Sequence, residues 1–173
     1  KDIKLNNLRN KIGIISQDVF LFADTIYNNI TLYNNNISLE EVKKAAIDLD
    51  IHEFIESLPD GYDFVVSERG SSLSAGQKQL IAFLRVLVNN PDILILDEAT
   101  SSIDSYSEEL IKKATKKITQ GKTSIIIAHR LSTIESADKI IYMENGQILE
   151  SGNHKELLKI ENGKLKKQYK DRK

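Results

Sequence analysis

The sequence lacks three features that would each place it in a particular class of protein. It has no cysteine in 173 residues, which excludes disulfides and thiolate chemistry and is compatible with a reducing cytoplasm. It has no run of about 18 apolar residues, so none of its segments is expected to span a bilayer. Its formal net charge is −1, and this balance argues against a nucleic-acid partner, which would call for a basic excess.

The most informative stretch is a predicted helix followed by a predicted strand. Ser74 and Gln77 form a capping-box pattern, so a helix is expected to begin there. Pro91 ends it, because the residue before a proline is pushed out of the helical region. The apolar residues 93–96 then run into two carboxylates. A short strand that is apolar on both faces predicts the centre of a parallel sheet, whose ligands bind beyond the carboxyl ends of its strands.

Other apolar runs and turn signals extend this α/β pattern to the rest of the chain. Buried strands are expected at residues 11–16 and 123–128, a capped helix at 38–50, a hairpin at 139–150 with Asn-Gly at its turn, and a last helix near 153–160. From residue 161 the tail is rich in lysine and poor in apolar side chains, which predicts disorder. We therefore expect one domain at residues 1–160, with a helical subdomain at about 20–90, and a charged tail at 161–173.

Two motifs now identify a family. Leu-Ser-Ala-Gly-Gln at residues 73–77 and the apolar strand that ends at Asp97 and Glu98 resemble the signature and Walker B motifs of the ABC (ATP-binding cassette) ATPases, specifically the nucleotide-binding domain of exporter-type transporters. The resemblance runs from about Asp2 to Leu158. It implies a P-loop NTPase-like fold with a mostly parallel sheet flanked by helices and a helical signature subdomain. It also implies ATP and Mg²⁺ as ligands and ATP hydrolysis as the reaction.

The signature has a physical basis in the N-terminus of a helix, where unpaired N–H groups and a partial positive charge attract anions. Ser74 adds a hydroxyl donor, and Gly76 allows close approach of the backbone to a phosphate. The resemblance implies that this turn, with Gln77, contacts the γ-phosphate of ATP held by the opposite subunit. Ala75 stands where the family most often has the first of two glycines, and we expect it to be tolerated.

The resemblance also assigns roles at the ends of the predicted strands. Asp97 would hold Mg²⁺, since hard cations choose oxygen ligands, and Glu98 would act as general base. Gln17 would reach the metal and the attacking water, and His129 would contact the γ-phosphate and orient the glutamate. Asp104, in the family's D-loop, would cross the dimer interface. The alternatives are an ordinary loop residue for Gln17 and a structural or surface histidine for His129, and the surrounding motifs disfavour both.

Two further segments favour an exporter over an importer. The loop that carries Phe20 and Phe22 would face a transmembrane partner, and Ser-Glu-Arg-Gly at residues 67–70 would touch its coupling helices. The implied partners are these transmembrane domains and a second nucleotide-binding domain, in a homodimer or a heterodimer. The implied location is the cytoplasmic face of the cell membrane, through the transmembrane domain. The same two segments argue against a soluble ABC ATPase of DNA repair or translation.

One element of the family is missing from the sequence. No Gly-x-x-x-x-Gly-Lys-Ser/Thr occurs, nor does the adenine-stacking aromatic residue that precedes it, and in the family both lie just upstream of Lys1. We therefore expect the C-terminal part of an exporter ATPase domain, inactive alone, whose sheet lacks its first strands and exposes apolar surface and an unpaired edge. The alternative is a hydrolysis-dead truncated cassette that acts as a regulatory or partner-binding module.

Overall fold

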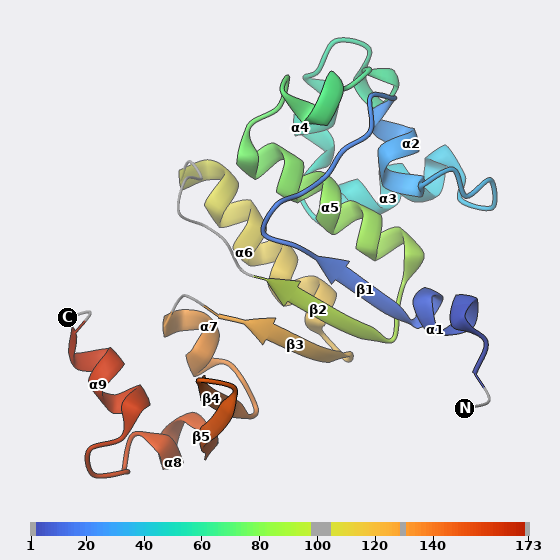
Figure 1. Cartoon of the computed structure of the whole chain (residues 1–173). Coiled ribbons are helices and arrows are strands. Elements are labelled where there is room, and N and C mark those ends of the chain that lie inside the picture. Colours follow the sequence, from blue (N-terminus) through green and yellow to red (C-terminus); the bar gives the residue numbers. More distant parts are fainter. Residues whose placement is uncertain (1–2, 98–104, 129–130, 172–173) are drawn as a thin grey trace. The chain divides into compact units, whose positions relative to one another are not determined.

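The computed structural model describes residues 3–97, 105–128 and 131–171 (Figure 1). They form two compact units, Lys1–Ile127 and Ala128–Lys173. The first unit contains α1 (Leu5–Lys11), β1 (Ile12–Ile15), α2 (Ile26–Thr31), α3 (Leu39–Asp48), α4 (His52–Glu56), short 3₁₀ helices at Gly61–Asp63 and Glu68–Gly70, α5 (Ala75–Asn89), β2 (Ile93–Asp97), α6 (Ser105–Thr119) and β3 (Thr123–Ile127). Within the described residues, none of the helices has the length and apolar character needed to cross a membrane.

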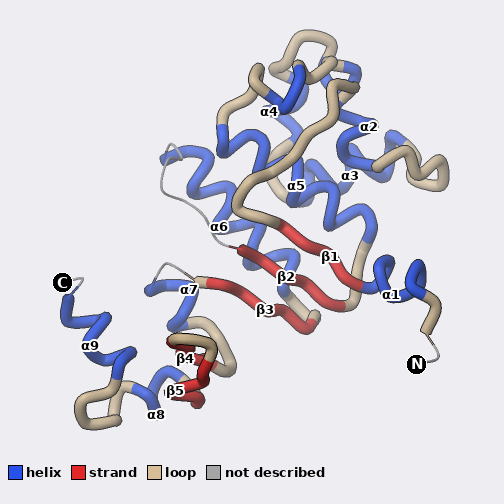
Figure 2. Tube along the Cα trace, in the orientation of Figure 1, coloured by secondary structure: helices blue, strands red, loops and turns tan. Residues whose placement is uncertain are grey.

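The sheet of the first unit is parallel, and β2 is its central strand, as the apolar run predicted. The order is β1-β2-β3, with Ile14 beside Ile95 and Ile95 beside Ile125 (Figure 2). A parallel neighbour needs a crossover connection, and here α2 to α5 separate β1 from β2, while α6 separates β2 from β3. The carboxyl ends of all three strands therefore meet at one edge.

The two capping boxes predicted from sequence open α3 and α5. Ser38 Oγ accepts a hydrogen bond from the Glu41 N–H, and the Glu41 carboxylate accepts one from the Ser38 N–H. Ser74 and Gln77 form the same pair at α5. That helix ends at Asn90, which takes the left-handed conformation with φ 42° directly before proline. The residues at its two ends therefore set where α5 begins and ends.

One face of the sheet packs against α5 and α6. Ile15, Leu94 and Leu96 point to this side and belong to one buried cluster with side chains of both helices, including Leu84 and Ile111. The cluster continues into α2, α3 and α4, so the sheet and the helical segment share a single core. This shared core holds α2 to α5 against the strands.

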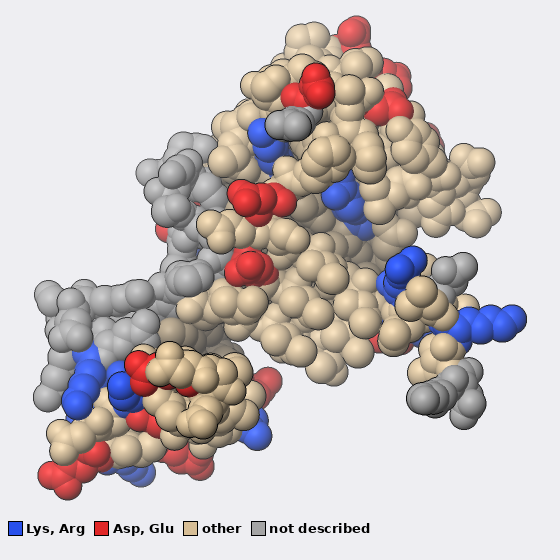
Figure 3. Space-filling view, viewed as in Figure 1, with Lys and Arg blue, Asp and Glu red and all other residues tan. Residues whose placement is uncertain are grey.

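The opposite face of the sheet is exposed. Ile14, Ile125 and Ile127 are 60%, 56% and 51% exposed, which corrects, for this face of the sheet, the prediction that residues 11–16 and 123–128 form buried strands. β3 is an edge strand, and in the described part of the chain no helix covers its outer face. In the view where the strands lie in front of α6, the first unit shows few charged side chains (Figure 3). The exposed apolar surface expected from the sequence is therefore present.

Gly13 allows β1 to pass very close to the end of α5. A Cβ atom added there would lie 2.6 Å from Cγ of Pro91 and 3.1 Å from Cγ1 of Val86, and neither atom belongs to a flexible chain end. We expect Gly13→Ala to lower the free energy of unfolding by about 1–3 kcal/mol through overpacking. The urea midpoint of the 173-residue chain measures this loss, with the exposed Ser124→Ala on β3 as control. Equal midpoints for the two variants would contradict the close approach.

The second unit contains α7 (Leu131–Glu135), the hairpin of β4 (Ile140–Glu144) and β5 (Gln147–Gly152), α8 (His154–Leu157) and α9 (Lys164–Asp171). The predicted Asn-Gly turn is confirmed, with positive φ at Asn145 (50°) and Gly146 (75°), as a two-residue hairpin turn requires. Asn153 and Glu156 form a capping box at the start of α8, where the last helix was expected.

The prediction of a disordered tail from residue 161 was wrong for α9. Leu165 is 1% exposed and packs with Ile134 and Leu157 in a small separate core. Lys164 pairs with Glu144 of the hairpin at 2.9 Å, and this contact raises the pKa of Lys164. Composition alone suggested disorder because the tail is mostly charged, but one buried leucine at the start of the helix attaches it to the hairpin.

Candidate functional site

Two of the predicted catalytic residues lie at the carboxyl edge of the parallel sheet. Ile15 of β1 pairs with Leu96 of β2, so the chain reaches Gln17 and Asp97 just beyond neighbouring strand positions. Asp97 is half-buried and Gln17 is exposed. This edge is where parallel α/β sheets bind their ligands. The structure therefore brings the two residues to the place where the sequence predicted a nucleotide site.

Three of the predicted residues lie outside the described part of the chain. Glu98 follows Asp97 directly in sequence, Asp104 immediately precedes α6, and His129 comes two residues after the end of β3. Their assignments as general base, D-loop acid and γ-phosphate ligand stay predictions.

The donor atoms at this edge suit a hard cation. Asp97 offers carboxylate oxygens and Gln17 an amide oxygen, the ligand type that Mg²⁺ prefers. In the residues that the structure describes, no cluster of three or more His, Asp or Glu could hold a metal by itself. Mg²⁺ usually takes one or two protein oxygens and completes its shell with water and substrate phosphates, so oxygen atoms of Asp97 and Gln17 are of the right kind and number.

The first turn of α5, residues 74–77, is called the signature turn here. Ser74 Oγ accepts from the Gln77 N–H at 3.2 Å, and Gln77 Oε1 accepts from the Ser74 N–H at 2.9 Å. This reciprocal pair leaves the Ser74 hydroxyl proton and the N–H groups of Ala75 and Gly76 without acceptors in the described part of the chain. Three donors at the positive end of a helix form a suitable place for a phosphate.

Ala75 fits the signature turn without backbone strain. It is the first helical residue of α5, and its φ is not positive. Its methyl group is exposed. The backbone conformation at this position therefore does not demand glycine.

The carboxyl edge adjoins the part of α5 that follows the signature turn. Gln79 and Phe83, further along α5, line a small cavity of about 20 Å³ together with Asp97. The signature turn itself makes no hydrogen bond to Gln17 or Asp97 in the described residues. The chain presents an acidic edge and a donor turn that are not joined by a hydrogen bond in the described residues.

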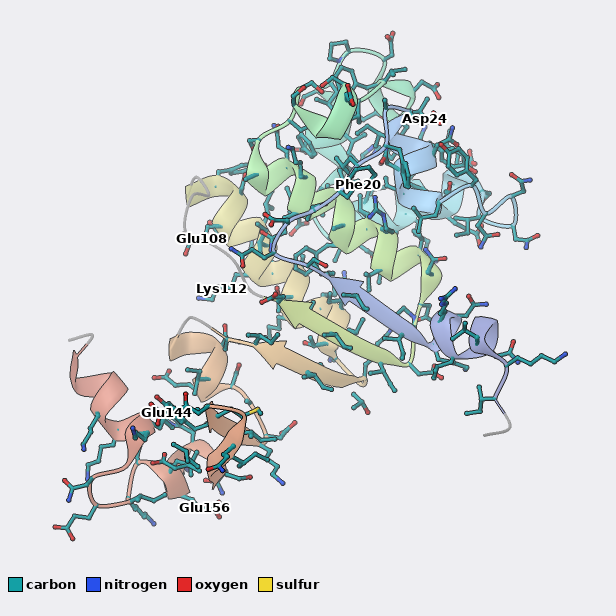
Figure 4. The ribbon with its side chains drawn as sticks, viewed as in Figure 1. Phe20, Asp24, Glu108, Lys112, Glu144 and Glu156 are labelled. Atoms are coloured by element: carbon teal, nitrogen blue, oxygen red, sulfur yellow. The ribbon has the colours of Figure 1, made fainter. Side chains whose placement is uncertain are left out.

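A third surface carries exposed aromatic side chains. We call residues 18–24 the aromatic loop. Phe20 is 57% and Phe22 43% exposed, and their rings meet edge to face with centroids 5.1 Å apart. Phe22 also lies 6.5 Å from the ring of Tyr33. Figure 4 shows Phe20 on the segment that crosses α5, and Asp24 at the start of α2.

The aromatic loop is joined to the segment that leads into residues 67–70. Thr25 and Val65 form an antiparallel bridge, and the Val66 N–H donates to the Asp24 carbonyl at 2.9 Å. Leu21 is fully buried, and its Cδ1 would lie 3.3 Å from a Cβ on Gly70. The structure therefore brings together the two segments that the sequence assigned to a transmembrane partner. The sequence did not predict this pairing, because the paired stretch is only three residues long.

A charged hydrogen-bond cluster fixes the outer side of the aromatic loop. The Tyr33 hydroxyl donates to Asp24 Oδ2 at 2.6 Å, and Asn28 Nδ2 donates to Asp24 Oδ1 at 2.9 Å. The bond from Tyr33 is the largest cause of the lowered pKa of Asp24, and the same bond raises the pKa of Tyr33. Asp24 therefore stays ionised and holds the loop against α2.

Comparison with known proteins places these features in a family. The model of the ABC transporter family matches residues 1–101. A putative multidrug export ATP-binding/permease protein, YgaD of Bacillus subtilis (strain 168), is 49% identical over 161 residues, which cover 93% of this chain and 28% of that protein. Its counterpart SAV1866 of Staphylococcus aureus (strain Mu50) is 50% identical over 158 residues, covering 91% and 27%.

A solved structure supports the same conclusion. A bacterial Atm1-family ABC exporter with ATP bound superimposes with a TM-score of 0.86 and 40% identity over 98% of this chain and 30% of that one. The chain thus spans less than a third of the length of these relatives. The match confirms the predicted α/β fold of the ABC ATPase type. The chain belongs to the ABC transporter family.

Proposed function

We propose that this chain is the C-terminal part of the ATP-binding and ATP-hydrolysing domain of an ABC exporter. It powers substrate translocation across a membrane through ATP-driven dimerisation. The observation that carries the proposal is that Gln17 and Asp97 both lie at the carboxyl edge of the parallel sheet, in a chain that is 49% identical to a putative multidrug export protein.

The reaction needs positioning and charge stabilisation more than covalent chemistry. Asp97, at the end of the central strand, would hold Mg²⁺, whose charge would offset that of the phosphates, and Gln17, just after the neighbouring strand, would add an oxygen ligand. Glu98 takes the proton of the attacking water, and His129 hydrogen-bonds the γ-phosphate and orients that carboxylate. The half-buried position of Asp97 supports its role, because partial exclusion of water strengthens a charge interaction.

The signature turn acts on the nucleotide of a second nucleotide-binding domain, in a homodimer or a heterodimer. Its three donors, which lack acceptors in the described residues, support this division of labour. Residues at about 20–90 form the helical subdomain that presents the turn, and Asp104 crosses the interface. Each composite site then takes its acidic edge from one chain and its donor turn from the other.

The aromatic loop and residues 67–70 form the contact with the transmembrane domains, at the cytoplasmic face of the membrane. The exposed rings of Phe20 and Phe22 support this assignment, since exposed aromatic clusters mark interaction surfaces. The names of the relatives, which join ATP-binding and permease functions, support it as well.

The mass and location of the native protein test the proposal. An antibody to the lysine-rich C-terminal tail is expected to detect a membrane-fraction band several times heavier than 19.6 kDa. A soluble band near 19.6 kDa would contradict the proposal and favour the second candidate, a hydrolysis-dead cassette that pairs with an intact partner.

A further inference from the structure

Arg85 joins the aromatic loop to the signature helix. It lies on α5, and its guanidinium bridges two backbone carbonyls that are distant in sequence. Nε donates to the Asn29 carbonyl at 2.9 Å, and Nη2 donates to the Phe20 carbonyl at 3.3 Å. One side chain therefore ties the loop, the end of α2 and α5 together.

The surroundings of Arg85 are unusual for a cation. In the described part of the chain no carboxylate forms an ion pair with it, and burial lowers its pKa. The Asn29 carbonyl belongs to the last turn of α2, where the helix dipole favours positive charge and the carbonyls lack helical partners. The flat fork of arginine reaches both carbonyls at once, which a lysine ammonium on its flexible stem does less well.

The side chain of Asn29 extends the link into the loop. It is fully buried, and its Oδ1 accepts from the Phe22 N–H at 2.8 Å. Its Nδ2 lies within hydrogen-bond distance of the carbonyls of Phe22, Asp24 and Thr25, at 3.0, 3.2 and 3.0 Å. The loop backbone is therefore fixed to α2 by Asn29, and both are fixed to α5 by Arg85.

We propose that Arg85 is a positioning residue that couples engagement of the signature turn with ATP to the conformation of the aromatic loop. Ser74 and Arg85 lie on one uninterrupted helix, about 16 Å apart along its axis at 1.5 Å per residue. A displacement of the first turn therefore reaches the guanidinium through a rigid element. The inference rests on the proposed function, in which the turn contacts nucleotide and the loop contacts the transmembrane partner.

Hydrogen exchange in the full-length protein tests the coupling. In a Glu98→Gln background, saturating Mg-ATP is expected to slow amide exchange in residues 74–78 and in the aromatic loop, the latter by roughly 5-fold or more. With Arg85→Met added, the slowing at 74–78 should persist while that in the loop is lost. Arg85→Lys keeps the charge but reaches only one carbonyl, so it should retain part of the slowing in the loop. This variant replaces Arg85→Met in the test if the methionine variant fails to fold.

Lys122→Met is the matched control. Lys122 also donates to a backbone carbonyl beside α5, that of Pro91 at 2.9 Å, but at the far end of the helix from the signature turn. This variant should leave the response of the loop unchanged. Equal slowing of the loop in the wild-type and Arg85 variants would overturn the inference while leaving the proposed function intact. If the protein that keeps Arg85 showed no slowing at residues 74–78, that result would contradict the proposed function and, with it, the inference.

Discussion

Replacement of Glu98 by glutamine is expected to reduce ATP turnover by the full-length protein by roughly 10²- to 10⁴-fold, the range that a general base contributes. Glutamine has the shape of glutamate but cannot accept the proton of the attacking water. Asp97 and the signature turn remain, so ATP binding should stay intact. With hydrolysis blocked, the two nucleotide-binding domains should accumulate as an ATP-bound dimer.

Steady-state phosphate release and ATP binding on the same preparation measure the two effects separately. Glu109→Gln makes the same chemical change on α6, where the carboxylate is exposed and pairs with Lys113 at 3.4 Å. It should turn over as the wild type does. If Glu98→Gln retained a near wild-type rate, the general-base assignment would be wrong.

The isolated 173-residue chain is expected to bind Mg-ATP more weakly than about 1 mM, and not to hydrolyse it. Its sequence has no Gly-x-x-x-x-Gly-Lys-Ser/Thr, so the main set of backbone donors for the phosphates is missing. Even a micromolar ligand has only about 8.2 kcal/mol of binding free energy, and one preorganised donor is worth roughly 2.7–4 kcal/mol in a catalytic site. Loss of the whole cradle therefore removes most of the affinity.

Isothermal titration calorimetry of the isolated chain and of the full-length protein makes the comparison direct. Circular dichroism on the same samples shows whether the isolated chain keeps its helices, so that absent binding is not confused with unfolding. A micromolar dissociation constant for the isolated chain would show that the phosphates are held by residues that we have not assigned.

The parts of the fold that sequence predicted are those set by neighbouring residues. The capping box of Ser74 and Gln77 is complete within one turn, and the turn at Asn145 and Gly146 needs only its own backbone. The position of β2 followed from an apolar run long enough for one strand. In each case the stabilising atoms lie within a few residues of one another, so the local sequence is sufficient to predict the structure.

The features that sequence missed depend on distant partners. β3 resembles a buried strand in composition, but Ile125 and Ile127 are exposed because no helix of the described chain covers that face of the sheet. The helix α9 forms where a charged tail was expected, since Leu165 has a distant core to enter. The bridge made by Arg85 joins segments far apart in the chain, and an arginine within an apolar helix gives no signal of which carbonyls it reaches.

The order of strands in the sheet has a consequence during synthesis on the ribosome. The neighbour of β1 is β2, and about 80 residues of chain separate Ile15 from Ile93. At a translation rate of 5–20 residues per second, β1 leaves the ribosome roughly 4–16 s before its partner strand exists. Helices form in microseconds, so α2 to α4 can fold in that interval. The apolar strand Ile12–Ile15 cannot pair with β2 during that time, which makes its side chains a natural binding target for a nascent-chain chaperone.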